Sequence, residues 1–237
     1  MRFRLPLNRA VFLVAAFAFS LLALVPLRIA VGWAGGGLAA REASGSIWLG
    51  VLKEARFGPA PLGDLEARLN VLPLFLGRAR LSLSRGEGQE GGRFAGAVTV
   101  SRHSFAVEDL TGQVRTGGLF GPLPIGAVDL DDVSARFASG LCESAEGQVR
   151  ATLAGAVAGV ALPATMAGAV RCAEGALLVP LAGQSGTQQL NLSLRPDGRY
   201  RIDLVIRQTD PSLVAALAAA GFRPSAEGYS RRIEGSF

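Results

Sequence analysis

Residues 188–207 read QQLNLSLRPDGRYRIDLVIR, and this stretch decides the fold. From Leu190 to Leu194 apolar and polar residues alternate strictly, so one face of the segment is apolar and the other polar, as in a half-buried strand. The sequence Pro-Asp-Gly stands between this run and the next, which is typical of a tight hairpin turn. The stretch therefore predicts an antiparallel hairpin of two strands, Gln188–Arg195 and Tyr200–Arg207.

The chain from residue 45 onward repeats this pattern of short runs separated by glycine-rich turns. We expect further strands at Ser46–Phe57, Leu65–Val71, Ala79–Ser84, Phe94–Val100, Phe105–Thr116, Ala127–Phe137, Gln148–Leu153, Ala164–Cys172, Ala176–Leu181 and Gly228–Gly235. Residues 210–221 predict a helix, with Asp as N-cap, Pro at the first helical position and Gly at the end. The predicted fold class is mainly β: a curved antiparallel sheet with one short helix near the C-terminus. The sheet is expected to form an open groove or half-barrel, with a sandwich as the alternative.

An apolar run precedes the β-rich part: residues 10–27 read AVFLVAAFAFSLLALVPL and carry no charge. About 20 apolar residues are needed to cross a bilayer as a helix, so we expect a transmembrane helix over residues 10–32. The residues expected to anchor it in the membrane are Ala10, Val11, Phe12, Leu13, Val14, Phe17, Phe19, Leu21, Leu22 and Leu24. Three arginines precede the run, which predicts a cytoplasmic N-terminus at residues 1–9 and export of all that follows. A cleaved secretory signal is the alternative, although its apolar core is usually shorter.

The part after the predicted helix divides into a Gly-rich linker, residues 33–44, and an exported β-rich domain, residues 45–237. The net charge of the chain is +5, but four arginines before residue 41 supply four of these charges. The exported part is therefore close to neutral, and it contains no cluster of Lys or Arg. This charge distribution excludes the basic face of a nucleic-acid-binding protein.

The sequence contains no recognisable set of catalytic or metal-binding residues. His103 is the only histidine, it lies in an expected hairpin loop, and no Gly-x-Ser-x-Gly nucleophile motif accompanies it. Residues 86–91 match the pattern GxGxxG, but a strand rather than a helix follows them and their two glutamates would repel phosphate. Asp129, Asp131 and Asp132 are interpreted as a solvated strand face, with a weak cation site or a pair of acid/base carboxylates as the alternative. We therefore expect no catalytic, cofactor-binding or metal site and no enzyme activity.

Two pairs of residues have a predicted structural role. Cys142 and Cys172 both lie on the exported side of the apolar run, which favours a disulfide, with two free buried thiols as the alternative. Trp33 is close to the predicted membrane helix and is expected at the membrane interface. Trp48 fits either the core or the interface, and core packing is favoured.

Several of these features occur in an order that resembles a known family. They are the segment Gly45-Ser-Ile-Trp-Leu-Gly50, the cysteine pair, and the closing residues Asp210, Pro211, Leu217, Gly221, Phe222, Gly228, Tyr229 and Gly235. Together with the basic N-terminus and apolar run they resemble the N component of the type II secretion system, over essentially the whole chain. Phe222 and Tyr229 are expected to have a structural or interface role.

The resemblance implies a single-span protein of the bacterial inner membrane with a β-rich periplasmic domain, similar to AsmA-like proteins whose strands build an open apolar groove. It implies a non-catalytic accessory or assembly role, with the inner-membrane platform and the secretin of the secretion system as partners. A second hypothesis is lipid handling, since strands with one apolar face would accept acyl chains if the sheet curled around an unfilled trough.

Overall fold

The computed structural model describes residues 20, 27, 38–86, 92–116, 118–120 and 123–236. No helix in this part of the chain is long and apolar enough to cross a membrane. The ten expected anchor residues and Trp33 lie outside the described residues, so the predicted membrane helix over residues 10–32 stays a prediction.

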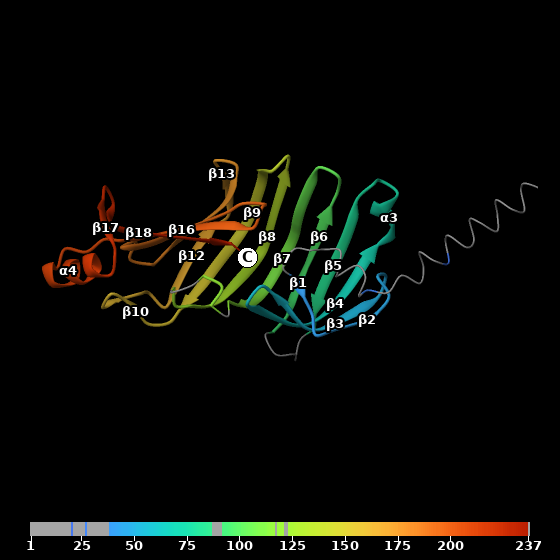
Figure 1. Ribbon diagram of the computed structural model, residues 1–237, viewed down its shortest axis with the longest axis horizontal. Helices are drawn as coiled ribbons and strands as arrows, with labels where there is room; N and C mark the ends of the chain where they lie inside the picture. Colours follow the sequence, from blue (N-terminus) through green and yellow to red (C-terminus); the bar gives the residue numbers. More distant parts are fainter. Residues whose placement is uncertain are drawn as a thin grey trace, which may run out of the picture.

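Within the described residues, sixteen strands form one antiparallel sheet in the order β1-β3-β4-β5-β6-β7-β8-β9-β12-β14-β15-β16-β18-β17, with β2 beside β3 and β13 beside β14 (Figure 1). The strands of the first half are β1 Leu38–Ala39, β2 Glu42–Gly45, β3 Gly50–Phe57, β4 Ala60–Asn70, β5 Ala79–Arg85, β6 Phe94–Val100, β7 Ser104–Arg115, β8 Ile125–Ala138 and β9 Leu141–Leu153. Those of the second half are β12 Thr165–Ala169, β13 Arg171–Ala173, β14 Ala176–Ala182, β15 Gln188–Leu194, β16 Arg199–Ile206, β17 Arg223–Ser225 and β18 Gly228–Ser236. A small separate ribbon pairs β10 Ala156–Val157 with β11 Val160–Ala161, and the helices are α3 Val71–Leu74 and α4 Pro211–Ala219.

The mainly β prediction is confirmed, and the large sheet stays open, because its first and last strands do not pair with each other. The alternative of a sandwich is wrong for the described residues, since one large sheet replaces two facing ones. The prediction of one short helix needs correction, because α3 is a second one.

The hairpin predicted from residues 188–207 is present as β15 and β16, paired from Gln188 with Ile206 to Leu194 with Tyr200. The Arg195 N–H donates to the Arg199 carbonyl at 2.9 Å, and Gly198 has a φ of 83°, which few other residues adopt without strain. The Pro-Asp-Gly sequence therefore forms the tight turn that its composition predicts.

Helix α4 also begins as predicted. The Asp210 carboxylate accepts hydrogen bonds from the Ser212 N–H at 2.9 Å and from the Ser212 hydroxyl at 2.6 Å. These bonds lower the pKa of Asp210, because they stabilise its charged form. Leu217 is fully buried, so the helix packs onto the sheet through this side chain.

The sheet begins earlier than the sequence predicts. The second part of the expected linker, residues 38–44, contributes β1 and most of β2, and both strands pair with the outer side of β3. The expected strand Ser46–Phe57 begins only at Gly50, because residues 46–49 form the turn between β2 and β3, with the Ser46 N–H bonded to the Leu49 carbonyl. Gly45 has a φ of 84°, which starts this turn.

Bulges with left-handed acidic residues bend the strands. Glu54, Asp109 and Asp132 have φ values of 48°, 55° and 52°, each at a shift in strand register. Such a backbone costs about 1 to 2 kcal/mol outside glycine. Each free N–H finds a side-chain oxygen on the neighbouring strand, for example the Asp109 N–H donating to the Ser134 hydroxyl at 2.9 Å. The bulges increase strand twist and favour the curvature seen in Figure 1.

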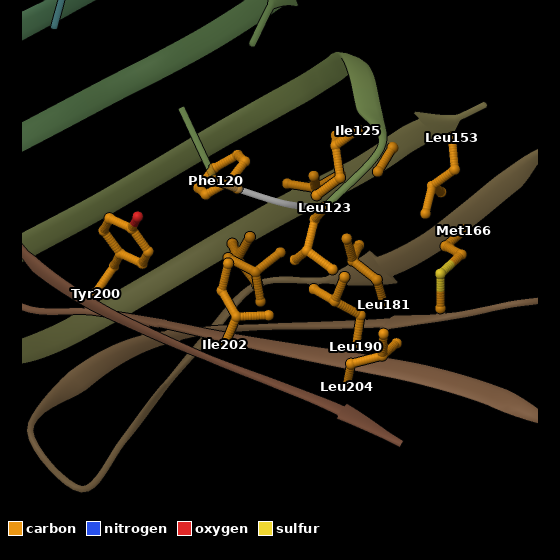
Figure 2. Close-up of a cluster of buried hydrophobic side chains, with 14 of the residues drawn as sticks. Phe120, Leu123, Ile125, Leu153, Met166, Leu181, Leu190, Tyr200, Ile202 and Leu204 are labelled. Carbon is orange, nitrogen blue, oxygen red and sulfur yellow. The ribbon is translucent and has the colours of Figure 1, made fainter. Parts of the chain in front are cut away.

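The main core lies inside the curled second half of the sheet, where side chains from β8, β9, β12 and β14–β16 point toward one another (Figure 2). Phe120 and Leu123, from the loop between β7 and β8, enter this space. The Phe120 ring meets the Tyr200 ring edge to face at 5.9 Å, and the Tyr200 hydroxyl donates to the Leu119 carbonyl at 3.3 Å. Side chains therefore fill the interior of this half of the sheet.

Candidate interaction surface

The last long strand, β18, has an edge without a partner strand among the described residues. On one side β18 pairs with β16 along residues 229–236. On the other side the short β17 covers only residues 228–230. Residues 231–236, which we call the free edge of β18, therefore present backbone N–H and C=O groups that no described strand satisfies. None of these six residues is buried.

Side chains on β16 hold the free edge in place. Arg232 forms an ion pair with Asp203 at 2.8 Å, and Glu234 forms one with Arg201 at 2.8 Å, so the two pairs cross the same strand interface with opposite polarity. The Asp203 carboxylate raises the pKa of Arg232, because it stabilises the guanidinium charge. The side chains of Arg201, Arg232 and Glu234 are about half exposed or more and that of Asp203 is about one third exposed, and solvated pairs of this kind contribute less than about 1 kcal/mol each. The two ion pairs hold β18 in register with β16 but add little to the free energy of unfolding.

An open strand edge of this kind binds a peptide or a second domain by accepting one more strand. The backbone supplies the hydrogen bonds, and the alternating side chains select the partner. The opposite end of the sheet offers shorter strands, since β1 has two residues and β2 has four. The free edge of β18 is thus the longest unpaired strand segment that terminates the described sheet.

The structure shows where the predicted disulfide and the predicted structural aromatic residues lie. Cys142 on β9 and Cys172 on β13 form a disulfide with 5.5 Å between their Cα atoms. Phe222 is buried in the main core and Tyr229 packs partly buried against it. Trp48 lies in the turn between β2 and β3, where it is partly exposed and is not one of the buried core residues.

The residues considered for catalysis or metal binding do not form a cluster in the described part of the chain. His103 lies exposed in the turn between β6 and β7, and its carbonyl accepts the Ser139 N–H at 3.1 Å. The Asp129 carboxylate accepts a hydrogen bond from the Gln113 amide at 2.9 Å. Over the described ranges, no group of three His, Cys, Asp or Glu residues is placed to hold a metal ion.

Two shallow hollows on the described surface each measure about 440 Å³. Arg80, Glu108 and Asp109 line the first, and Arg231 and Arg232 line the second. Both are rich in charged groups, whereas an acyl chain needs an apolar lining. Together with the filled interior, these hollows give the lipid-handling hypothesis no support.

The sequence predicts the strand Gly228–Gly235, but it does not predict that one edge of this strand is left unpaired. Which strand ends a sheet depends on pairing between distant segments, and no local pattern in residues 228–236 carries that information. The short β17 and its Pro224, which cannot donate a ladder hydrogen bond, are the features that signal the end of the sheet.

The comparisons with known proteins bear on the role of this domain. A family model described as type II secretion system (T2SS), protein N, matches residues 36–232, which include almost all of the described sheet. No curated protein and no solved structure matches the chain. None of these comparisons supports the expected relation to AsmA-like proteins. The chain belongs to the protein N family of the type II secretion system, and its role therefore lies in type II protein secretion together with other components of that system.

Proposed function

We propose that the chain is a non-catalytic accessory or assembly component of the type II secretion system, held in the bacterial inner membrane by one helix with its β-rich domain in the periplasm. The single observation that carries this proposal is the family match over residues 36–232. It covers the whole described domain except the last four residues of β18, so the family relation concerns the sheet itself.

The proposed location is supported by charge and by redox chemistry. Arg2, Arg4 and Arg9 precede the apolar run, a bias that keeps the flanking segment in the cytoplasm. The disulfide between Cys142 and Cys172 suits the oxidising periplasm and is uncommon in the cytosol.

The proposed mode of action is docking of another secretion component on the free edge of β18. The six residues of this edge are long enough for a short added strand, because strands of five to six residues are the commonest in sheets. Arg232 and Glu234 alternate in charge along the edge, which favours a partner strand with the complementary order of charges. The inner-membrane platform and the secretin are the partners that we propose.

Deletion of the gene in a host with an active type II system tests the proposal. We expect export of folded periplasmic substrates to fall, and complementation with the full chain to restore it. A general growth defect is controlled by following a protein exported to the periplasm by another route. Unchanged secretion of every type II substrate in the deletion strain would argue against the proposed function.

A further inference from the structure

An apolar loop projects from the sheet between β4 and β5. Its residues 71–78 read VLPLFLGR and begin with the short helix α3, at the upper right of the sheet in Figure 1. The side chains of Leu72, Phe75 and Leu76 are 80%, 82% and 78% exposed. Large apolar side chains rarely lie this exposed side by side unless they contact another molecule.

The loop holds these side chains outward by a defined backbone. The N–H groups of Leu76 and Arg78 both donate to the Pro73 carbonyl at 3.0 Å, and the Gly77 N–H donates to the Leu74 carbonyl at 3.0 Å. Gly77 has a φ of 69°, which closes the turn. These side chains are therefore held outward by a turn with a defined hydrogen-bonded backbone.

Two further turns lie at the same ends of the strands. Residues 46–49 lie beside the end of β4, because the Leu69 N–H donates to the Ile47 carbonyl at 3.0 Å. Residues 101–103 follow the end of β6 and lie beside the start of β5, because Val100 at the end of β6 pairs with Ala79 at the start of β5. The three turns, residues 46–49, 71–78 and 101–103, form what we call the loop edge.

The loop edge combines apolar and basic groups. Leu49 adds a side chain that is 62% exposed. Arg78 and Arg102 are exposed, and neither forms an ion pair with any described residue. None of the three turns contains Asp or Glu. An apolar tip with unpaired cations around it is complementary to a surface that is apolar inside and anionic outside, which is the arrangement of an anionic bilayer.

One residue connects the loop edge to the predicted membrane helix. Leu27 lies at the end of the apolar run of residues 10–27 and is only 2% exposed. It packs at the start of β3, where a Cβ on Gly50 would lie 2.5 Å from its Cδ2 atom. Gly50 directly follows the turn of residues 46–49, so Leu27 itself lies beside the loop edge.

We propose that the loop edge lies on the membrane and that Leu72, Phe75 and Leu76 insert into the surface of an anionic bilayer. This inference rests on the proposed function in one respect, which is the membrane anchor over residues 10–32. Insertion would fix the orientation of the sheet relative to the membrane, so the opposite strand ends would point into the periplasm.

The test uses the full chain in vesicles of phosphatidylethanolamine and phosphatidylglycerol, with a single NBD fluorophore on an introduced cysteine. Because both native cysteines are in the disulfide, F75C supplies the only free thiol among the described residues. A154C is the matched control, because Ala154 is exposed and follows the far end of β9. F17C places the label in the predicted membrane helix and tests the anchor by itself.

We expect lipids with a spin label near the headgroup to quench the F75C label and to leave the A154C label unaffected. The F75C emission is also expected to shift to the blue, and the change L72S together with L76S should reduce both effects. An F17C label that is quenched by lipids with a spin label deep in the acyl chain, together with an unquenched, water-accessible F75C label, would overturn this inference and leave the proposed function standing. Quenching of neither label would overturn both. Quenching of F75C alone would support insertion and refute the anchor.

Discussion

Removal of the disulfide provides a quantitative test of how the sheet is held together. The bond joins Cys142 at the start of β9 to Cys172 on β13, across a sequence separation of 30. In the chain-entropy account a loop of this length stabilises the fold by about 3.6 kcal/mol, because the bond restricts the unfolded chain. A domain of this size loses about 2 to 4 °C of melting temperature per kcal/mol. The double variant C142A/C172A is therefore expected to melt about 7 to 14 °C lower.

The native sheet is expected to survive this change, because hydrogen bonds hold the same region without the sulfurs. The Cys142 N–H donates to the Gly175 carbonyl at 2.9 Å, and the Val170 N–H donates to the Gly147 carbonyl at 3.1 Å. Far-UV circular dichroism of the full chain in detergent micelles measures both the sheet content at low temperature and the melting temperature.

Chemical reduction of the parent protein is the control, since it breaks the bond and keeps both sulfur atoms in place. Reduction and the double variant should lower the melting temperature by similar amounts. A shift below about 2 °C in both, which is less than about 1 kcal/mol, would refute the entropic reasoning.

Three further changes test packing at single positions, each by urea unfolding of the full chain in micelles. G168A should lower the free energy of unfolding by about 1 to 3 kcal/mol, because its Cβ would clash with the Pro180 carbonyl oxygen. G126A should change it little, because its Cβ would lie 3.8 Å from the nearest atom. R85M should lower the free energy of unfolding by about 3 kcal/mol, because the buried guanidinium donates to the carbonyls of Leu62, Gly92 and Gln113 and these carbonyls would lose their partner. An unchanged urea midpoint would mean that water replaces the guanidinium. L217A should cost about 2 to 5 kcal/mol, because this fully buried side chain attaches α4 to the core, and a cost below 1 kcal/mol would contradict that attachment.

The elements that the sequence predicted well are those with local signals. The hairpin of β15 and β16 has strict alternation before Pro-Asp-Gly and a strand-like apolar run after it, and α4 has its cap residues in place. The turn of residues 46–49 was missed because Ser-Ile-Trp-Leu reads as strand, and only the flanking Gly45 and Gly50 mark its ends.

The features that form the candidate surfaces depend on contacts between distant segments. The free edge of β18 exists because no described strand pairs with the outer side of β18 beyond residue 230, which no pattern within the strand reveals. The loop of residues 71–78 did carry a signal, since Pro73 and Gly77 interrupt its apolar run. Its exposure still follows only from the sheet, because the same composition also fits a buried segment.

Crosslinking in living cells tests the central claim most directly. A photo-crosslinking amino acid is placed in the full chain at Glu234 on the free edge of β18, and in a control at Thr152, which is also exposed but lies on β9 with strands paired on both sides. We predict that Glu234 gives adducts with another component of the type II secretion system and that Thr152 does not. Adducts at Glu234 that contain no secretion component, or the same adducts at both positions, would contradict it.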